Sequence, residues 1–468
     1  MTQLGQLPVA VIGAGPVGLA AAAHLADRGI PFVVLEAGES PAAAVRQWGH
    51  VRLFSPWRYN IDAAAARLLI DAGWVRPDDD KLPTGAQLAA EYLQPLADLP
   101  ALKPHVRYDA RVVAVTRLGL DRLRSAGRAE APYLIRLANG EDVLARTVID
   151  AAGTWDTPNV LGAAGIAAHG ESEAQACVES ALPDVPGRDR DRFEGQRVLV
   201  VGAGHSAANT LLYLTELPGT TVTWAIRAAS PARTYGGESA DALPARGLLG
   251  SRLREHVESG TITLLTGFSV QAVSAGPAGV EVSDGARSVT VDRIVSATGF
   301  RPDHGIVSEL RLDLDPVMGS TRALAPLIDP NEHSCGTVPP HGVDELTHPE
   351  PGYYAIGSKS YGRAPTFLMA TGYEQARSVV AAIDGDWAAA RDVQLDLPET
   401  GVCSSNVPLD ADSITAEAGG CCGAPAEAEL VAAGRGLATG VSGGLVRAPL
   451  TVITAPAGQQ EQTGGCCS

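Results

Sequence analysis

Three glycines near the start of the chain stand at a spacing that can hold a phosphate group. Gly13, Gly15 and Gly18 form the pattern G-x-G-x-x-G between an apolar run at residues 9–12 and an alanine-rich helical pattern. The first glycine permits a tight turn, the second lets backbone N–H groups reach a pyrophosphate, and the third allows a helix to pack closely on a strand. The helix N-terminus adds partial positive charge. This pattern predicts that backbone groups bind a phosphorylated ligand.

An acidic residue completes the first pattern. A second apolar run, at residues 32–35, ends in Glu36. An acid about twenty residues after such glycines accepts hydrogen bonds from the ribose hydroxyls of an adenine dinucleotide. The alternative is an ordinary glycine-rich turn, but strand, turn, helix, strand and acid all occur here in register. Residues 9–36 therefore predict a Rossmann-type unit that binds an adenine dinucleotide.

The same pattern returns in the middle of the chain. A strand leads to Gly202 and Gly204, and Ala207 takes the third small position, while the next strand ends in Arg227 instead of an acid. An arginine at this place pairs with a 2′-phosphate, which an acid would repel. The second unit is therefore predicted to prefer NADPH over NADH, with Arg233 as an assisting contact.

Small-residue turns close both units. One turn, around Gly153, follows strands with Asn139-Gly140 at a hairpin position, and the other, around Gly299, follows strands with Asp284-Gly285 at a turn. Nucleotide motif, β-meander and small-residue turn thus occur twice in one chain. An internal duplication of this sort is more specific than either glycine motif alone.

Two further segments are expected to return to the first unit. The loop around residues 46–60 is rich in aromatic residues and arginines; it either packs into the core or lays Trp48, Leu53 and Ser55 against a flat ring. Later, a strand at residues 353–356 reaches Gly357, and Pro365 is expected to be the first residue of a long helix whose positive end faces that ring. A plain strand, loop and helix is the alternative there. Thr84 is expected to cap a helix.

Composition narrows the classes of partner. The 468 residues allow two or three domains, and the net charge of −17 without a basic patch argues against nucleic acid or an anionic membrane as partner. No apolar run is long enough to span a bilayer, and the N-terminus lacks the basic start of a signal peptide. We therefore expect a cytoplasmic protein that acts on a small-molecule substrate.

The cysteines gather in a tail of low complexity. Beyond about residue 395 the sequence consists mainly of Ala, Gly, Ser, Pro and Glu and is predicted to be disordered. It contains two adjacent pairs, Cys421-Cys422 and Cys466-Cys467, each preceded by two glycines. Neighbouring Cα atoms are about 3.8 Å apart, which is short for a disulfide, so each pair suits one soft acceptor such as a trivalent metalloid or a thiophilic metal. The alternative is that these thiols are inert or crosslink chains.

Taken together, these motifs resemble a known family. The sequences GAGPVG, GAGHSA, AAGTW, SATGF and GYYAIGS are similar to those of the two-dinucleotide-binding-domain flavoproteins of the pyridine nucleotide-disulfide oxidoreductase superfamily, and within it to the flavin-containing monooxygenase-like group, over residues 5–390. The resemblance implies an α/β fold with two Rossmann-like domains, each with a β-meander. Its expected parts are an FAD domain (1–160 and 300–392), a linker (161–194), an NADPH domain (195–299) and the tail (393–468).

The resemblance also implies roles for single residues. The residues expected to hold FAD are Gly13, Gly15, Gly18, Glu36, Gly153 and Gly357, with Trp48 and Leu53 at the flavin and the backbone of Val113 at the adenine. Those expected to hold NADPH are Gly202, Gly204, Ser206, Ala207, Arg227 and Gly299. Ser55 and Tyr361 are the candidates for hydrogen bonds to the flavin or to its oxygen adduct.

The sequence departs from the family in ways that leave the reaction open. The F-x-G-x-x-x-H signature of the monooxygenases is not intact, no C-x-x-C follows either glycine motif, and the usual late G-D reads Gly357-Ser358. The first hypothesis is an NADPH-dependent monooxygenase that oxidises a soft nucleophile. The second is an NADPH-dependent reductase of a thiol or metalloid, and the third is a metalloid-binding protein or redox sensor with structural FAD. The paired cysteines and the stretch SYGRAPTFLMATGYEQ also look similar to flavoproteins of bacterial arsenic-resistance clusters. Substrate and oligomeric state stay open.

Overall fold

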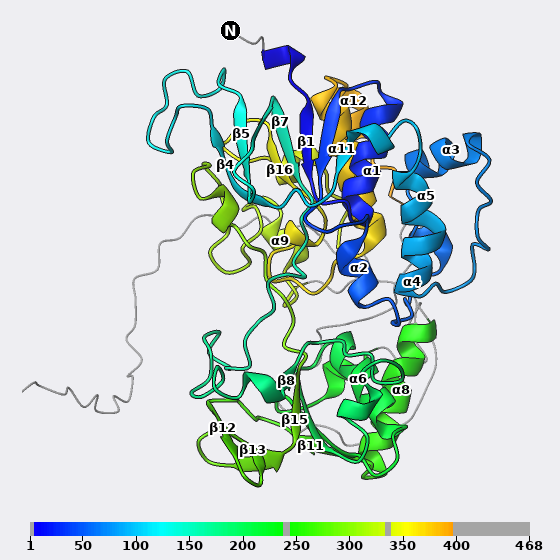
Figure 1. Cartoon of the computed structure of the whole chain (residues 1–468), viewed down its shortest axis with the longest axis vertical. Coiled ribbons are helices and arrows are strands. Elements are labelled where there is room, and N and C mark those ends of the chain that lie inside the picture. Colours follow the sequence, from blue (N-terminus) through cyan, green and yellow to red (C-terminus); the bar gives the residue numbers. More distant parts are fainter. Residues whose placement is uncertain (1–3, 237–243, 333–337, 396–468) are drawn as a thin grey trace, which may run out of the picture. The chain divides into compact units, whose positions relative to one another are not determined.

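The computed structural model describes residues 4–236, 244–332 and 338–395. The cysteine pairs of the tail lie outside these residues. Short helices and loops connect two separate parallel sheets, each with a smaller antiparallel sheet beside it (Figure 1). Within the described ranges, no helix is both long enough and apolar enough to cross a membrane.

The first sheet has the strand order β16-β7-β1-β2-β3, and all its pairings are parallel. Its strands are β1 (Val9–Ile12), β2 (Phe32–Leu35), β3 (Val106–Arg107), β7 (Thr147–Asp150) and β16 (Tyr353–Ala355). Every residue of β1 and β7 is buried, as expected for central strands covered on both faces. The late strand β16 pairs with β7, so the chain returns to the first sheet at its end, as the sequence predicts.

The helices of this first domain pack closely around the alanine-rich helix α1. Helix α1 (Pro16–Asp27) follows β1, begins with a proline at its first position, and packs against α3 (Ala63–Asp71) and α11 (Met369–Ile383). The smaller sheet consists of β4 (Val112–Arg117), β5 (Tyr133–Leu137) and β6 (Asp142–Ala145). Gly140 has φ +88° at the turn between β5 and β6, which confirms the predicted hairpin.

Helix ends follow the sequence in one case and depart from it in another. Thr84 caps α4 (Gly85–Gln87) through a reciprocal pair of hydrogen bonds with Gln87, as predicted. Helix α11, in contrast, begins at Met369 and not at Pro365, so that prediction was wrong. The reason is packing, because residues 366–368 stay outside the helix and the ring of Phe367 packs against Tyr361, with centroids 5.3 Å apart.

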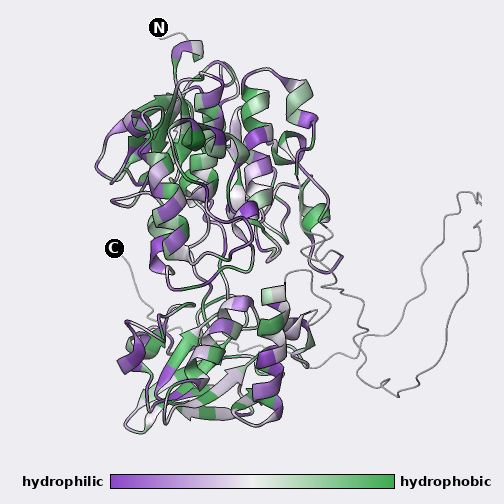
Figure 2. Ribbon diagram, turned by 90° about the vertical axis from the view of Figure 1, so that its right-hand side faces the viewer, coloured by the Kyte–Doolittle hydropathy of each residue, from purple (hydrophilic) through white to green (hydrophobic). Residues whose placement is uncertain are grey.

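The second sheet repeats the arrangement with the order β11-β10-β9-β15-β8, again all parallel. Its strands are β8 (Val178–Glu179), β9 (Arg197–Val201), β10 (Thr221–Ala225), β11 (Ile262–Leu265) and β15 (Arg293–Ser296). Beside it lie α6 (His205–Thr215), α7 (Ala232–Tyr235), α8 (Pro244–Glu258) and the antiparallel β12 (Ala272–Gly276), β13 (Gly279–Ser283) and β14 (Ser288–Val291). Figure 2 shows hydrophobic residues along the strands of both sheets. The predicted fold class is confirmed.

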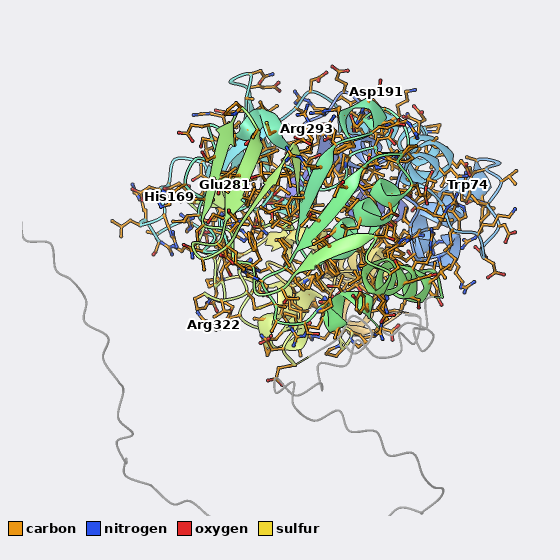
Figure 3. The ribbon with its side chains drawn as sticks, turned by 90° about the horizontal axis from the view of Figure 1, so that it is seen from below. Trp74, His169, Asp191, Glu281, Arg293 and Arg322 are labelled. Atoms are coloured by element: carbon orange, nitrogen blue, oxygen red, sulfur yellow. The ribbon has the colours of Figure 1, made fainter. Side chains whose placement is uncertain are left out.

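Residues 161–194, expected to be a linker, belong to the second domain. Strand β8 pairs in parallel with β15, and Phe193 is fully buried in the second core. Arg293 of β15, labelled in Figure 3, donates a 3.0 Å hydrogen bond to the carbonyl of Ala176. The segment lacks periodicity because single anchors, not a regular helix or strand face, hold it to the sheet.

The chain crosses between the two domains twice, and the two crossings pair with each other. Residues Pro158 and Phe300 form an antiparallel bridge. Asn159 donates its backbone N–H to Gly299 and its side-chain amide to the carbonyl of Thr298, at 2.9 and 3.0 Å. The connection is therefore a short two-stranded ribbon.

The described residues also form a few short helices. These are α2 (Ala43–Gln47), α5 (Gln94–Ala97), α9 (Ala325–Ile328), α10 (Val343–Leu346), α12 (Trp387–Arg391), a π-helical stretch at Leu88–Leu93 and several 3₁₀ turns. Of these, α2 lies closest in sequence to the first glycine motif, and its residues help to enclose the site described next.

Candidate functional site

A cavity of about 690 Å³ lies at the carboxyl ends of the strands of the first sheet. Ligands of open parallel sheets bind at this edge. Among the residues predicted from the sequence, those that line the cavity are Gly13, Gly15, Glu36, Trp48, Gly153 and Gly357. The structure thus brings together residues from distant parts of the chain at one site.

Two of the three glycines of the first motif are required by the protein's own packing. Gly13 has φ +96°, and a Cβ there would lie 2.8 Å from the carbonyl oxygen of Ala151. A Cβ on Gly18 would lie 2.0 Å from the carbonyl oxygen of Gly13. Both distances are far below van der Waals contact, so these positions would demand glycine even without a ligand.

Gly15 has no such reason within the chain. Its backbone is extended, with φ −77° and ψ −175°, and a Cβ there would meet no atom within 4 Å. It is the N-cap of α1 and offers no side chain to the first N–H groups of the helix, which are free for an anion. Since Gly15 lines the cavity, the space that a side chain would fill fits a pyrophosphate lying against the helix N-terminus.

Glu36 is held in place by backbone donors. One carboxylate oxygen accepts a hydrogen bond from the N–H of Ala14 at 2.6 Å, and the other from the N–H of Gly38 at 2.8 Å. Each carboxylate oxygen can accept two hydrogen bonds. The buried carboxylate is therefore fixed at the cavity wall and keeps one acceptor position per oxygen for ribose hydroxyls.

Several residues proposed from the sequence do not line the cavity. Leu53 packs against the first hydrophobic core, and the hydroxyl of Ser55 donates to the amide oxygen of Asn60 at 2.8 Å. Tyr361 is buried beside Phe367. The side chain of Val113 is 44% exposed. Arg111 and Val112, the two residues before it, line the cavity instead. The structure thus offers no support for catalytic roles of Ser55 and Tyr361, because loop side chains turn according to packing that residue type does not reveal.

Other lining residues were not named from the sequence. Trp155 donates its indole N–H to the side-chain oxygen of Gln47 at 2.8 Å and stacks on Phe300 with ring centroids 5.0 Å apart. Phe367, just before α11, also lines the cavity. With Trp48, these rings give the cavity flat apolar walls. The small-residue turn before Trp155 was the signal that could have found it.

A buried polar group lies beneath the cavity and was also missed. Asp150, the last residue of β7, accepts hydrogen bonds from the ammonium group of Lys359 at 2.6 Å, from the hydroxyl of Tyr353 at 3.0 Å and from the N–H of Ala152 at 3.2 Å. Lys359 lines the cavity together with its neighbours Gly357 and Ser358. Asp150 and Lys359 are 209 positions apart, so sequence spacing gave no sign of this pair.

The second sheet carries a matching arrangement. A Cβ on Gly202, where φ is +137°, would lie 2.0 Å from the carbonyl oxygen of Ala297, whereas a Cβ on Gly204 would meet no atom within 4 Å. Gly204 is the N-cap of α6, Ser206 lies in the first turn of that helix, and Ala207 is fully buried. As in the first domain, the protein's own packing gives no reason for a glycine at the middle position, whereas a bound ligand would give one.

The residues expected to choose the second dinucleotide lie past β10. Arg227 is exposed, and its guanidinium donates to the carbonyl of Ala163 at 3.2 Å. Arg233 lies in α7. Gly299, with φ +87°, lies in the crossing segment beside Asn159. Arg227 thus lies at the end of the strand that follows the second glycine motif, with its charge toward solvent.

The described residues contain no group of three or more His, Cys, Asp or Glu side chains that could hold a metal ion. The predicted metalloid ligands Cys421, Cys422, Cys466 and Cys467 fall outside the described part of the chain. The structure therefore does not test them.

Two parallel sheets, each with an open middle glycine at a helix N-terminus, define a protein with two dinucleotide sites. A family model described as pyridine nucleotide-disulphide oxidoreductase matches residues 10–334. This match spans more than half of the chain, and the chain belongs to that family.

Individual relatives include both monooxygenases and reductases. Indole-3-pyruvate monooxygenase YUCCA1 of Oryza sativa subsp. japonica is 29% identical over 206 residues, which are 44% of this chain and 44% of that protein. The chain thus matches less than half the length of this curated relative. A solved structure of the bacillithiol disulfide reductase Bdr from Bacillus cereus has a TM-score of 0.61 at 19% identity, over 81% of this chain and 99% of that one. A mutant of the flavin monooxygenase from Stenotrophomonas maltophilia has a TM-score of 0.56 at 22% identity, over 81% and 98%. These structures show the shared fold.

Proposed function

We propose that this protein is a monooxygenase that takes reducing equivalents from NADPH and adds oxygen to a small, soft nucleophile. One observation carries the choice of reaction. The sequence contains no C-x-x-C, and the single cysteine of the described residues, Cys177, does not line the cavity. A dithiol reductase of this superfamily needs such a pair to carry electrons from the flavin. Without a C-x-x-C near the flavin site, we propose that the electrons pass from the cofactor directly to oxygen.

FAD, when bound, supplies the chemistry of accepting hydride and passing electrons to oxygen. The protein's residues bind it and shield it. Gly15 and the N-terminus of α1 would hold the diphosphate, and Glu36 would hold the ribose. The rings of Trp48, Trp155 and Phe367 form apolar walls that exclude water, which lets a reactive state persist long enough to meet a substrate. No acid or base residue needs to act in this scheme.

The relatives support this proposal in part. The rice protein and the Stenotrophomonas protein are monooxygenases by name, whereas the Bacillus protein is a disulfide reductase. The disulfide reductase from Bacillus has the same overall fold as this chain, and this observation favours a reductase function. Direct reduction of a thiol or metalloid substrate is therefore the competing function.

Oxygen dependence separates the two functions. The purified protein, loaded with FAD, is given NADPH and a panel of thiols, amines and trivalent arsenicals, with and without oxygen. We expect oxygen uptake that matches the amount of oxygenated product, and no substrate-dependent NADPH oxidation under anaerobic conditions. Substrate-dependent anaerobic turnover would instead identify a reductase.

The choice of NADPH rests on Arg227. Replacing Arg227 by alanine removes one charge-assisted contact to the 2′-phosphate, which costs roughly 1.5–3 kcal/mol, or about tenfold or more in affinity for NADPH. The affinity for NADH should stay the same, because NADH lacks that phosphate. Arg252→Ala is the matched control, since it removes an exposed positive charge from α8 of the same domain. Equal weakening of both dinucleotides by Arg227→Ala would show that this residue does not read the 2′-phosphate.

We also propose that the tail binds a trivalent metalloid such as arsenite through Cys421-Cys422 and Cys466-Cys467. The support is the sequence, in which two adjacent thiol pairs follow glycine pairs, and its similarity to flavoproteins of arsenic-resistance clusters. Soft thiolates select soft acceptors. Binding would either present the metalloid to the flavin or sequester it.

A further inference from the structure

Asp150 joins two turns of the FAD cavity that lie 209 positions apart in the chain. Its carboxylate accepts from the N–H of Ala152 in the turn after β7, at 3.2 Å, and from the ammonium group of Lys359 in the turn after β16, at 2.6 Å. The hydroxyl of Tyr353 adds a third hydrogen bond, at 3.0 Å. Both turns line the cavity. The position of the Lys359 ammonium relative to the cavity is thus set by the carboxylate of Asp150.

The ammonium group of Lys359 has more N–H donors than it has hydrogen-bond acceptors among the described residues. The side chain is 1% exposed, so water does not reach it freely, and among the described residues its one hydrogen bond goes to Asp150. An ammonium group carries three N–H donors. Buried donors without acceptors are costly, and a ligand that brings oxygen atoms into the cavity removes this cost.

A second buried ion pair in the same domain shows what a purely structural pair looks like. Arg117 donates to Glu350, to the carbonyl of Ala131 and to the carbonyl of Pro351, so it has acceptors for several of its N–H groups. Arg128 donates to the same carboxylate. Neither arginine lines the cavity. The pair of Asp150 and Lys359 differs in both respects, because its cation has a single hydrogen-bond acceptor among the described residues and belongs to a residue that lines the cavity.

The charge of Lys359 is felt by its surroundings. The pKa of His304 lies below its ordinary value. The largest cause is burial of the ring, and the next is the positive charge of Lys359, which disfavours the positively charged, protonated ring. The carboxylate of Asp150 acts on the pKa of His304 in the opposite direction, but more weakly than Lys359 does. The neighbouring cavity residue is Ser358, which carries no charge that would oppose an anion.

We propose that Lys359 binds the diphosphate of the dinucleotide in the first domain and that Asp150 is its positioning residue. This inference rests on the assignment of the cavity to FAD and extends it to a named cation. The helix N-terminus at Gly15 supplies backbone donors to the same anion, and Lys359 supplies a full positive charge from the turn after β16. Together they offset the two negative charges of the diphosphate.

Binding of ADP and adenosine to the apoprotein tests the proposal without any turnover. ADP carries the diphosphate, whereas adenosine shares only the nucleoside. We expect Lys359→Met to weaken binding of ADP and FAD by a similar factor of about tenfold or more, the loss of one charge-assisted contact. Adenosine affinity should not change. Lys359→Arg, which restores the charge, should recover part of the affinity for ADP.

Two further variants separate positioning from folding. Asp150→Asn keeps the shape but removes the charge that holds Lys359, so ADP affinity should fall while adenosine affinity stays the same. Glu350→Gln is the matched control for a weakened buried ion pair, and it should lower thermal stability without changing ADP affinity.

Equal ADP affinity in wild-type protein and folded Lys359→Met would overturn the proposal, as would equal losses for ADP and adenosine. If Lys359→Met does not fold, the double variant Asp150→Asn/Lys359→Met, which leaves no unpaired charge, takes its place with the same expected result. A wild-type protein that binds ADP and FAD as described but oxygenates no substrate would refute the monooxygenase function alone and leave this assignment intact.

Discussion

The two outer glycines of the first motif and the middle one meet different physical needs, and this difference can be measured. Gly18 lies against the carbonyl of Gly13, whereas Gly15 faces open space. Gly15→Val should therefore give a folded protein that does not retain FAD, since its side chain fills the space of the pyrophosphate. Gly18→Val should fail to accumulate as folded protein, because its side chain has no room.

The measurement is circular dichroism together with the flavin absorbance of each purified variant. Gly29→Ala is a suitable control, since Gly29 lies outside the cavity and a Cβ there meets no atom within 4 Å. Its left-handed φ of +65° gives that control only a modest cost in stability. If Gly15→Val retained FAD at full occupancy, the assignment of the first site would be wrong.

Residues whose chemistry depends on local spacing could be predicted, and those that depend on distant contacts could not. Gly15 and Glu36 belong to one strand, turn and helix, so about thirty consecutive residues contain the whole pattern. Val113 is adjacent to Val112, which lines the cavity, and the register irregularity of β4 between Val112 and Ala114 cannot be read from residue spacing. Asp150 and Lys359 meet only because β16 pairs with β7, and this pairing follows from the fold and not from the spacing.

Helices, strands and turns also divide into those that local sequence determines and those that distant contacts determine. The hairpin at Gly140 and the cap at Thr84 follow from side chains that act on their own backbone, and both were predicted. Strand β8 has two residues and α11 starts four residues after Pro365, and in both cases packing against another part of the chain sets the boundary. Element type was therefore readable from sequence, whereas short strands and helix starts required the tertiary structure.

The segment before β16 contains a histidine that should make the first domain sensitive to acid. Burial, followed by repulsion from His304, lowers the pKa of His348 from 6.5 to about 4. Below about pH 6.5 the unfolded chain binds a proton at this residue that the folded chain does not bind, so stability falls as the pH drops toward 4. The shift corresponds to about 3 kcal/mol.

The variant His348→Asn isolates this contribution. Its amide oxygen can accept the hydrogen bond that the ring nitrogen now accepts from the N–H of Asp313, but the side chain does not titrate. Relative to the variant, the wild type should lose roughly 5 °C or more in melting temperature between pH 7.5 and pH 4.5. A constant difference between the two proteins across this range would contradict the assignment.

At the scale of the whole molecule, the tail can be removed to test its separate role. The first and second sheets and their cavity lie within residues 4–395, so a chain that ends near residue 395 should keep its FAD content. Arsenite binding, measured by protection of thiols from alkylation, should be lost on truncation. A full-length variant with serine at Cys421, Cys422, Cys466 and Cys467 is the matched control. Unchanged arsenite affinity in either protein would show that the tail does not bind the metalloid.

The order of strands in the first sheet has a consequence for synthesis on the ribosome. All five strands of the second sheet lie between residues 178 and 296, so that domain has its complete sheet while the polypeptide is still growing. The first sheet must wait for β16, and α1 must wait for α11 to cover it. Helix α3 can cover one part of α1 early, but until residue 383 has left the exit tunnel the part of α1 that packs on α11 lacks that partner. We therefore expect nascent chains to leave the α11-facing part of the N-terminal helix uncovered for most of translation, which makes it a site where a chaperone would bind.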